Sequence, residues 1–144
     1  MRAFATLPEV TLEVGGTRLD GAEVRSLSDV RVQQRLNLPA QCELVFRNPP
    51  AAFIDDSRLT IGAALRVSVR GQPIPLFDGE VTALELVYAP DAGQVLHVRA
   101  YDRLHRLRKH APIRAHVDLT LVEIARELLG AAGVAVQANA VGPR

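Results

Sequence analysis

Histidines are the first residues in this chain whose chemistry could support a function. All four lie between positions 97 and 116: His97, His105, His110 and His116. Imidazole nitrogens are common zinc ligands, so such a cluster could bind a metal ion. However, no two of these histidines have the i, i+4 spacing of one helix face, and the chain has neither an HExxH motif nor a cysteine pair. We therefore predict no metal site, and we expect surface or interface histidines.

Carboxylates and nucleophilic side chains give no stronger indication of a catalytic site than the histidines do of a metal site. Asp55 and Asp56 form the only acidic doublet, and adjacent side chains point apart on a strand or a helix. Cys42 is predicted to face the core, where a thiol is inert. No serine lies in a GxSxG motif, and the chain has no GxGxxG or Walker A sequence. We therefore predict no catalytic residues, no cofactor and no enzymatic activity; a hydrolase would need an acid/base pair or a metal shell.

The one local anomaly in charge is a group of basic residues in and around the segment 103–109, which we call the basic connector. Between positions 99 and 118, only Asp102 and Asp118 offset a group of six cations: Arg99, Arg103, Arg106, Arg108, Lys109 and Arg114. Leu104 and Leu107 indicate one or two helical turns with a small apolar side. The connector is either a solvated linker whose leucines close the end of a barrel, or a docking surface for an acidic partner.

The most strongly predicted element is an amphipathic helix over residues 120–129. Thr120 and Glu123 have the spacing of a capping box. One apolar stripe follows helical periodicity, and we expect it to be buried on a sheet: Leu121, Ile124, Ala125, Leu128 and Leu129. Gly130 or Gly133 is predicted to end the helix. The polar face of this helix and the connector supply the candidate protein-interface residues: Arg103, Arg106, Arg108, Lys109, Glu123, Arg126 and Glu127.

Short alternating segments precede this helix and predict strands. They lie at residues 10–14, 17–19, 24–38, 41–47, 65–70, 81–88 and 95–101. Gly15-Gly16 and the five-residue loop 89–93 are predicted hairpin turns, and residues 51–57 form a short helical turn. We therefore predict a mainly β (α+β) fold: a curved antiparallel sheet or small β-barrel with one packed amphipathic helix. It forms one domain over residues 1–137, and residues 138–144 are a tail or a linker into a downstream region.

Composition limits the partners. The chain has 144 residues, 48% of them hydrophobic, and a net charge of +1 from 17 basic and 16 acidic side chains. This near-neutral balance argues against nucleic-acid binding, which requires a large basic excess. The chain has no tryptophan and only two tyrosines, so it is poorly equipped to stack sugars or bases. A small glycan- or peptide-binding β-barrel remains the alternative function, because such a barrel needs only a lined cavity with a few polar groups.

Location is constrained by what the sequence lacks. The segment 1–8 has no apolar signal core, and no apolar run approaches the roughly 18 residues that a membrane span requires. One cysteine allows no internal disulfide. We expect assembly in the cytoplasm without a signal peptide, no stable membrane insertion, and a place in a virion or an extracellular particle after release.

Several of these segments together resemble the N-terminal region of phage late control D and VgrG-type spike proteins. The resemblance is carried, in order, by residues 44–48 (LVFRN), Ile61-Gly62, 77–82 (FDGEVT), 96–107 (LHVRAYDRLHRL), 119–125 (LTLVEIA) and Gly133-Val134. It covers most of residues 8–136. Each motif is a general sheet or turn pattern, but their order and spacing are specific.

This resemblance implies a baseplate hub in a contractile injection system or a phage tail, with the tube/hub barrel fold. Such hubs are trimers that join the inner tube to the spike and carry no catalytic residues. The implied partners are copies of the chain itself, an inner tube protein, and other baseplate and spike-tip proteins. Members of this family continue with a second barrel, an OB-fold and a β-helical spike, which these 144 residues do not contain. We therefore expect a fragment, a split subunit or a shorter relative.

Overall fold

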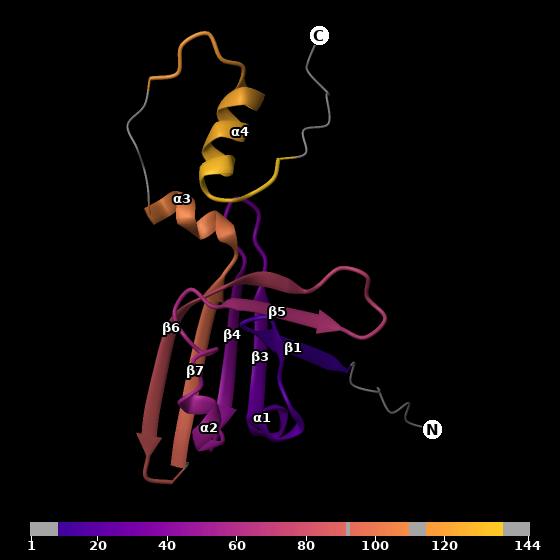
Figure 1. Cartoon of the computed structure of the whole chain (residues 1–144), viewed down its shortest axis with the longest axis vertical. Coiled ribbons are helices and arrows are strands. Elements are labelled where there is room, and N and C mark those ends of the chain that lie inside the picture. Colours follow the sequence, from indigo (N-terminus) through magenta and orange to yellow (C-terminus); the bar gives the residue numbers. More distant parts are fainter. Residues whose placement is uncertain (1–8, 92, 110–114, 137–144) are drawn as a thin grey trace. The chain divides into compact units, whose positions relative to one another are not determined.

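The computed structural model describes residues 9–91, 93–109 and 115–136. The chain divides into two compact units, Met1–Asp102 and Arg103–Arg144. The first unit is a sheet with two short helices, and the described part of the second is helical (Figure 1). We expected one domain over residues 1–137; its extent remains a prediction, because compact units need not coincide with domains.

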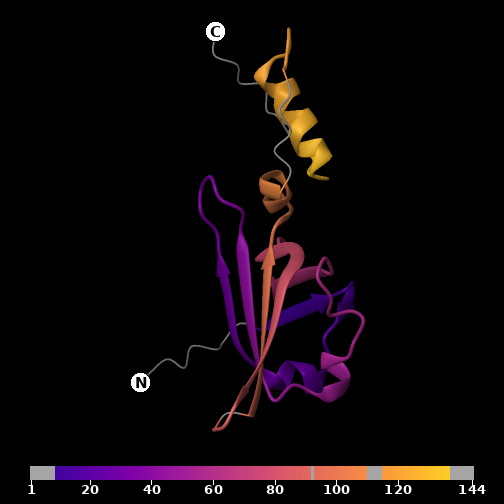
Figure 2. The ribbon, with the colours of Figure 1, turned by 90° about the vertical axis from the view of Figure 1, so that its left-hand side faces the viewer.

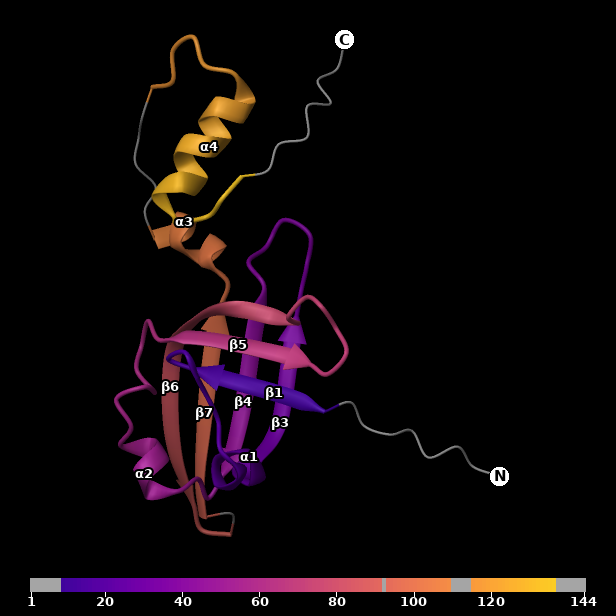
Figure 3. The ribbon, with the colours of Figure 1, turned by 45° about the vertical axis from the view of Figure 1, so that its right-hand side comes forward.

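The first unit is a seven-stranded antiparallel sheet with the strand order β2-β1-β5-β6-β7-β4-β3. In chain order its strands are β1 Val10–Val14, β2 Thr17–Arg18, β3 Leu27–Gln33, β4 Gln41–Arg47, β5 Ala64–Val69, β6 Phe77–Ala89 and β7 Gly93–Tyr101. Strands β1 and β5 cross in front of β3, β4 and β7, so the sheet is curled (Figures 1 and 3). Seen from the side, β1 and β5 lie on one side of the long strands (Figure 2). The prediction of a mainly β fold with a curved antiparallel sheet is confirmed.

Strand β6 joins the two halves of this curl. Its first residues pair with β5, from Phe77↔Val67 to Glu80↔Ala64, and the rest pairs with β7 as far as Ala89↔Gly93. Gly79 lies where the halves meet. A Cβ atom there would collide with the carbonyl oxygen of Tyr101 and would lie 2.6 Å from the ring of Phe77. This position therefore has no room for a side chain.

Two β-bulges add to the curvature, since an extra residue bends a strand and increases its twist. Thr82 is the extra residue in β6, and Ser28 is the extra residue in β3. Each hydroxyl donates to a carbonyl of the neighbouring strand: Thr82 Oγ1 to Arg99 O at 3.3 Å, and Ser28 Oγ to Val45 O at 3.0 Å. At each bulge, the hydroxyl of the extra residue therefore forms a hydrogen bond to the paired strand.

One face of the sheet forms the core, as the alternation predicted. Cys42, Leu44 and Phe46 are fully buried and lie opposite Ala100, Val98 and Leu96. The rings of Phe46 and Phe53 meet edge to face, with centroids 5.1 Å apart. Phe53 belongs to α2, Ala51–Ile54, within the helical turn expected at 51–57. This helix therefore covers part of the core.

Some predicted boundaries are wrong. Residues 24–38 were expected to be one strand, but α1, Gly21–Ser26, precedes β3, and Leu36 lies in a turn. The helix begins because Asp20 and Glu23 form a capping box, in which each side chain accepts from the other residue's backbone N–H. The hairpin turn is shorter than predicted, because Ala89 and Gly93 already pair with each other.

The second unit contains η1 Arg103–His105, α3 Arg106–Lys109 and α4 Leu121–Ala131. The predicted helix and its capping box at Thr120 and Glu123 are confirmed. Gly133, with φ of 74°, ends it in a Schellman arrangement: Gly133 N donates to Gly130 O, and Val134 N to Leu129 O. No residue of α4 is buried, so the expected burial of its apolar stripe on the sheet is not confirmed and stays a prediction.

The C-terminal prediction is tested only in part. Residues 134–136 form no strand. The expected tail, 138–144, lies outside the described residues, as do His110 and Arg114. No helix among the described residues has the length and apolar character needed to cross a lipid bilayer.

The core predicts a large effect of truncating Phe53. Phe53→Ala is expected to lower the free energy of unfolding by about 3–5 kcal/mol, because it removes a buried ring and leaves a cavity beside Phe46. Urea denaturation followed by circular dichroism would measure it. Ile61, which is 70% exposed, supplies the matched control. Ile61→Ala is expected to change stability by no more than about 0.5 kcal/mol. Equal effects of the two substitutions would contradict this account of the core.

Candidate interaction surfaces

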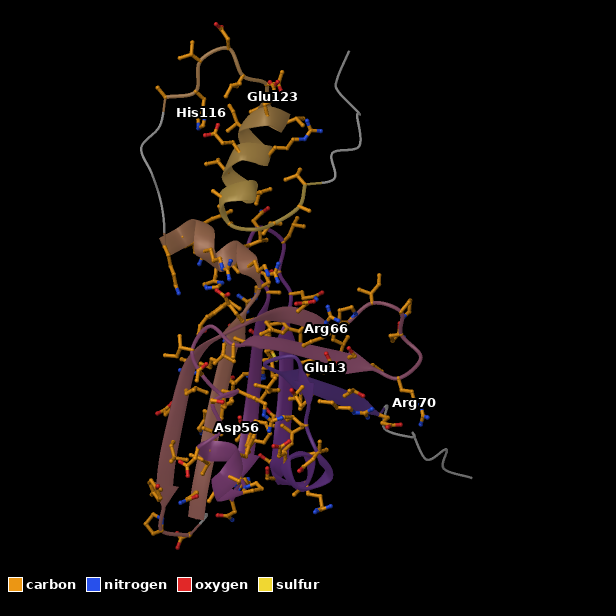
Figure 4. All side chains as sticks on the ribbon, viewed as in Figure 1. Glu13, Asp56, Arg66, Arg70, His116 and Glu123 are labelled. Carbon is orange, nitrogen blue, oxygen red and sulfur yellow. The ribbon has the colours of Figure 1, made fainter. Side chains whose placement is uncertain are left out.

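The outer face of the sheet carries ordered charge. Two rows cross the strands with alternating sign: Glu13, Arg66 and Asp78 on β1, β5 and β6, and Arg31, Glu43 and Arg99 on β3, β4 and β7. Arg66 Nη2 lies 2.6 Å from Asp78 Oδ2, and Arg99 Nε lies 3.2 Å from Glu43 Oε1. Figure 4 labels Glu13 and Arg66 on their adjacent strands. Exposed pairs of this kind contribute little stability, but cross-strand opposite charges favour this register.

A partly buried ion-pair network ties α1 to the turn before β5. The Glu23 carboxylate, almost fully buried, accepts from Asp20 N at 2.7 Å and from Arg58 Nη2 at 2.8 Å. Arg58 also donates to Asp56, through its backbone N–H at 2.8 Å and its side chain at 2.5 Å. The hydrogen bonds from the Arg58 side chain, then from its backbone N–H, lower the pKa of Asp56 below the ordinary 3.8. Within the acidic doublet, Asp56 therefore has a structural role in this network, whereas Asp55 is exposed.

The remaining candidates for chemistry occupy separate places. Cys42 is fully buried, which confirms its predicted place in the core. Burial raises the pKa of its thiol to about 12, so the thiol stays protonated. His97 lies on the outer face of β7, and His105 is buried in η1. His116 Nδ1 lies 3.6 Å from Glu127 Oε2. Among residues 9–91, 93–109 and 115–136, no three metal-binding side chains gather into a possible ion site.

Two of the connector arginines contact the end of α4. Arg106 Nη1 donates to Ala132 O and Arg103 Nη1 to Gly133 O, each at 3.5 Å. Cations are favoured at a helix C-terminus, where carbonyl groups lack helical partners. These two predicted interface residues therefore have an internal role, since they link the connector to α4.

Two of the other predicted interface residues, both glutamates, also have contacts within the second unit. Glu123 accepts from Thr120 N at 2.8 Å, and this backbone hydrogen bond lowers the pKa of its carboxyl. Glu127 faces His116. Arg108, Lys109 and Arg126 are exposed. Figure 4 labels Glu123 at the start of α4 and His116 on the preceding loop. Arg103 and Arg106 are exposed as well, so all five cations of the candidate interface are accessible to solvent.

Sequence reasoning missed an apolar surface on the first unit. The loop between β3 and β4 exposes Leu36 and Leu38, and the loop between β5 and β6 exposes Ile74 and Leu76. Gln34 Nε2 donates to Leu76 O at 2.9 Å, so the two loops lie side by side. The sequence offered little signal, because Leu36 and Leu38 lie in the predicted strand 24–38 and Ile74 and Leu76 lie between two predicted strands. That signal does not show that loops 42 positions apart in sequence meet.

Comparison with known structures identifies the fold. The tail protein from Neisseria meningitidis MC58 is 17% identical to this chain, with a TM-score of 0.60 over 85% of this chain and 33% of its own. The 43 kDa tail protein of prophage MuSo2 from Shewanella oneidensis is also 17% identical, with a TM-score of 0.62 over 86% of this chain and 37% of its own. The chain shares the fold of these two proteins.

This likeness is limited in length and is not accompanied by a sequence match. The chain spans about a third of the length of the two tail proteins. No family model matches it, and no curated protein matches it. The comparison therefore establishes the fold, and the functional conclusion requires a separate proposal.

The Asp56 network predicts a pH dependence of stability. Because the pKa of Asp56 is lower in the folded protein than in the unfolded chain, its stabilisation is complete above about pH 4 and is lost as the pH falls through the folded-state pKa. Asp56→Asn should lower the melting temperature at pH 7 and make its decline between pH 4 and pH 2 shallower. Melting curves by circular dichroism would test this, with Asp55→Asn as the control for charge. A wild-type slope in Asp56→Asn would contradict the assigned role.

The helix-terminal arginines predict a local effect. Arg106→Ala is expected to lower the hydrogen-exchange protection of α4 amides by about two- to fivefold, because a cation near the helix C-terminus is lost. Arg108→Ala, two positions away and exposed, is the matched control and should leave this protection unchanged. If both substitutions have the same effect, the contact between Arg106 and the helix end is not stabilising.

Proposed function

We propose that this chain is a structural component of a phage tail or a related contractile injection system, and within it a hub module that joins the inner tube to the spike. The observation that carries the proposal is the shared fold: both tail proteins match over more than four fifths of this chain, with TM-scores of 0.60 and 0.62. The ordered motifs that resemble late control D and VgrG-type proteins support the finer assignment to a hub.

The distribution of polar groups supports an assembly role without catalysis. Arg58, Glu23 and Asp56 hold elements of the first unit together, and Arg103 and Arg106 bond to the end of α4. These side chains, which in another protein could serve chemistry, are engaged in maintaining the fold. Function is then expressed through exposed surfaces, which here include charged strands, loops and the basic residues Arg108, Lys109 and Arg126.

The sheet also has edges on which an assembly could build. Strand β3 is an edge strand of seven residues, and the opposite edge, β2, has only two. Unpaired strand edges invite pairing with other chains, and closed rings remove them. We propose a trimeric hub that contacts an inner tube protein and further baseplate and spike-tip proteins. In this proposal the chain assembles in the cytoplasm and remains in the released particle.

The proposal predicts where the protein is found. In particles purified from the strain or phage that encodes it, antibodies to the chain should label one end of the tail in electron micrographs. Deleting its coding region should abolish complete tails, and supplying the wild-type product should restore them. The proposal is wrong if the protein separates from particles during purification and the deletion leaves tail yield unchanged.

A matched pair of variants tests the exposed basic residues in the same assay. Arg108→Glu with Arg126→Glu is expected to restore fewer complete tails than wild type, with no change in melting temperature. Arg47→Glu reverses an exposed charge on the sheet instead and should restore tails as wild type does. Equal restoration by all three proteins would remove Arg108 and Arg126 from the interface.

A further inference from the structure

The dipeptide Asp-Gly occurs twice in the sequence, at Asp20-Gly21 and Asp78-Gly79. An aspartate followed by glycine is especially prone to isomerise, because glycine has no side chain to shield its backbone nitrogen or to restrict its rotation. That nitrogen attacks the aspartate carboxyl group and forms a five-membered succinimide ring. Opening of the ring by water leaves either aspartate or isoaspartate, in which the main chain runs through the side-chain carbon. Both dipeptides are therefore sites at which the chain could modify itself.

This reaction requires no reagent other than water. At the second dipeptide, the Gly79 nitrogen forms a bond to Asp78 Cγ, and the hydroxyl of the carboxyl group leaves as water together with the amide proton. One water molecule then adds across one of the two C–N bonds of the ring. Cleavage of the bond to the main-chain carbonyl carbon of Asp78 leaves Gly79 linked through Cγ. The mass of the chain is therefore unchanged, whereas the path of its backbone is altered.

Packing requires the glycine at position 79. Gly79 lies where the two halves of the curled sheet meet, and a Cβ atom there would collide with the carbonyl oxygen of Tyr101. The same atom would lie 2.6 Å from the ring of Phe77. The glycine that makes Asp78 reactive therefore cannot be replaced without disturbing the sheet.

Two features of the sheet hold Asp78 away from this reaction. Asp78 lies in β6 and pairs with Arg66 of β5, which Figure 4 labels. Ring closure requires the Gly79 nitrogen to turn towards Asp78 Cγ, and this rotates ψ of Asp78 out of the extended range of a strand. In addition, Arg66 donates to Asp78 Oδ2 from Nε at 3.1 Å and from Nη2 at 2.6 Å. A rotation of the carboxyl group towards the Gly79 nitrogen works against both hydrogen bonds.

The protection of Asp78 by Arg66 comes from a side chain at the surface. The side chains of Arg66 and Asp78 are 51% and 46% exposed, so the water that opens the ring reaches this site. Asp20 is held differently, because its Oδ1 accepts from the backbone N–H groups of Ala22 at 2.8 Å and Glu23 at 2.9 Å. The two Asp-Gly sites thus have the same sequence, but a side chain restrains one and the start of α1 restrains the other.

We propose that Asp78-Gly79 is a site of spontaneous isoaspartate formation and that Arg66 restrains this modification in the folded chain. Isoaspartate adds one carbon to the main chain of β6 beside the junction of the two halves. Phe77, which is buried and pairs with Val67, would then fall out of register with the pairs that follow it. This inference goes beyond the proposed tail function and does not depend on it, because it concerns the chemical ageing of the chain itself.

Ageing the purified chain at neutral pH and digesting it with trypsin measures both sites in one sample. Cleavage after arginine places Asp20 in the peptide 19–25 and Asp78 in the peptide 71–99. Isoaspartate changes the retention of a peptide but not its mass, and fragmentation by electron transfer locates it. A chain kept unfolded in urea gives the unrestrained rate, and the folded chain is expected to isomerise at Asp78 more slowly. Equal rates in the folded and unfolded chains overturn the proposal.

Arg66→Ala tests the ion pair separately from the rest of the fold. It is expected to raise the rate at Asp78 in the folded chain by about two- to fivefold, as the loss of an exposed ion pair allows, and to leave the rate at Asp20 unchanged. Arg31→Ala removes an exposed arginine from the other charged row and, as the matched control, should change neither rate. The role of Arg66 is refuted if Arg66→Ala isomerises at Asp78 as slowly as wild type. It is also refuted if both sites accelerate equally, because that result would indicate general unfolding.

Discussion

The continuity of β6 is the constraint on which the rest of the first unit depends. One strand of 13 residues pairs with β5 at its start and with β7 along the remainder, so it alone connects the two halves of the curled sheet. Gly79 permits the close approach of Tyr101 where the halves meet, and the Thr82 bulge bends the strand just beyond it. With this path fixed, the buried faces of both halves enclose one core, while the charged rows remain outside.

Much of this fold is predictable because strand burial has a period of two. The alternation at 41–47 correctly placed Cys42, Leu44 and Phe46 inside, and the Thr120–Glu123 capping box correctly placed the start of α4. The same rule misled at 24–38, since alternation continues through residues that the Asp20–Glu23 capping box holds in a helix. It also could not reveal what covers the apolar stripe of α4, because periodicity defines a face and not its partner.

The candidate surfaces were less predictable, because they depend on contacts between distant positions. The connector arginines looked like free cations in the sequence, yet Arg103 and Arg106 contact carbonyl groups 30 and 26 positions away. Backbone acceptors carry no sequence signature, so only the structure reveals this use. The exposed aliphatic residues of loops 34–40 and 70–76 were missed for the same reason. They belong to two loops, and the hydrogen bond from Gln34 to Leu76 joins these loops.

The way β7 ends has a mechanical consequence. Strand β7 is hydrogen-bonded on both sides, to β6 and to β4, and the residue after it clasps a neighbouring segment: Asp102 N donates to Ala40 O at 3.0 Å, and Ala40 N donates to Asp102 Oδ2 at 2.8 Å. A tensile force applied to the chain beyond Asp102, directed along β7, would strain all these hydrogen bonds together in shear instead of rupturing them one after another. Separating β7 from the sheet in this direction would therefore require more force than peeling it away from one end.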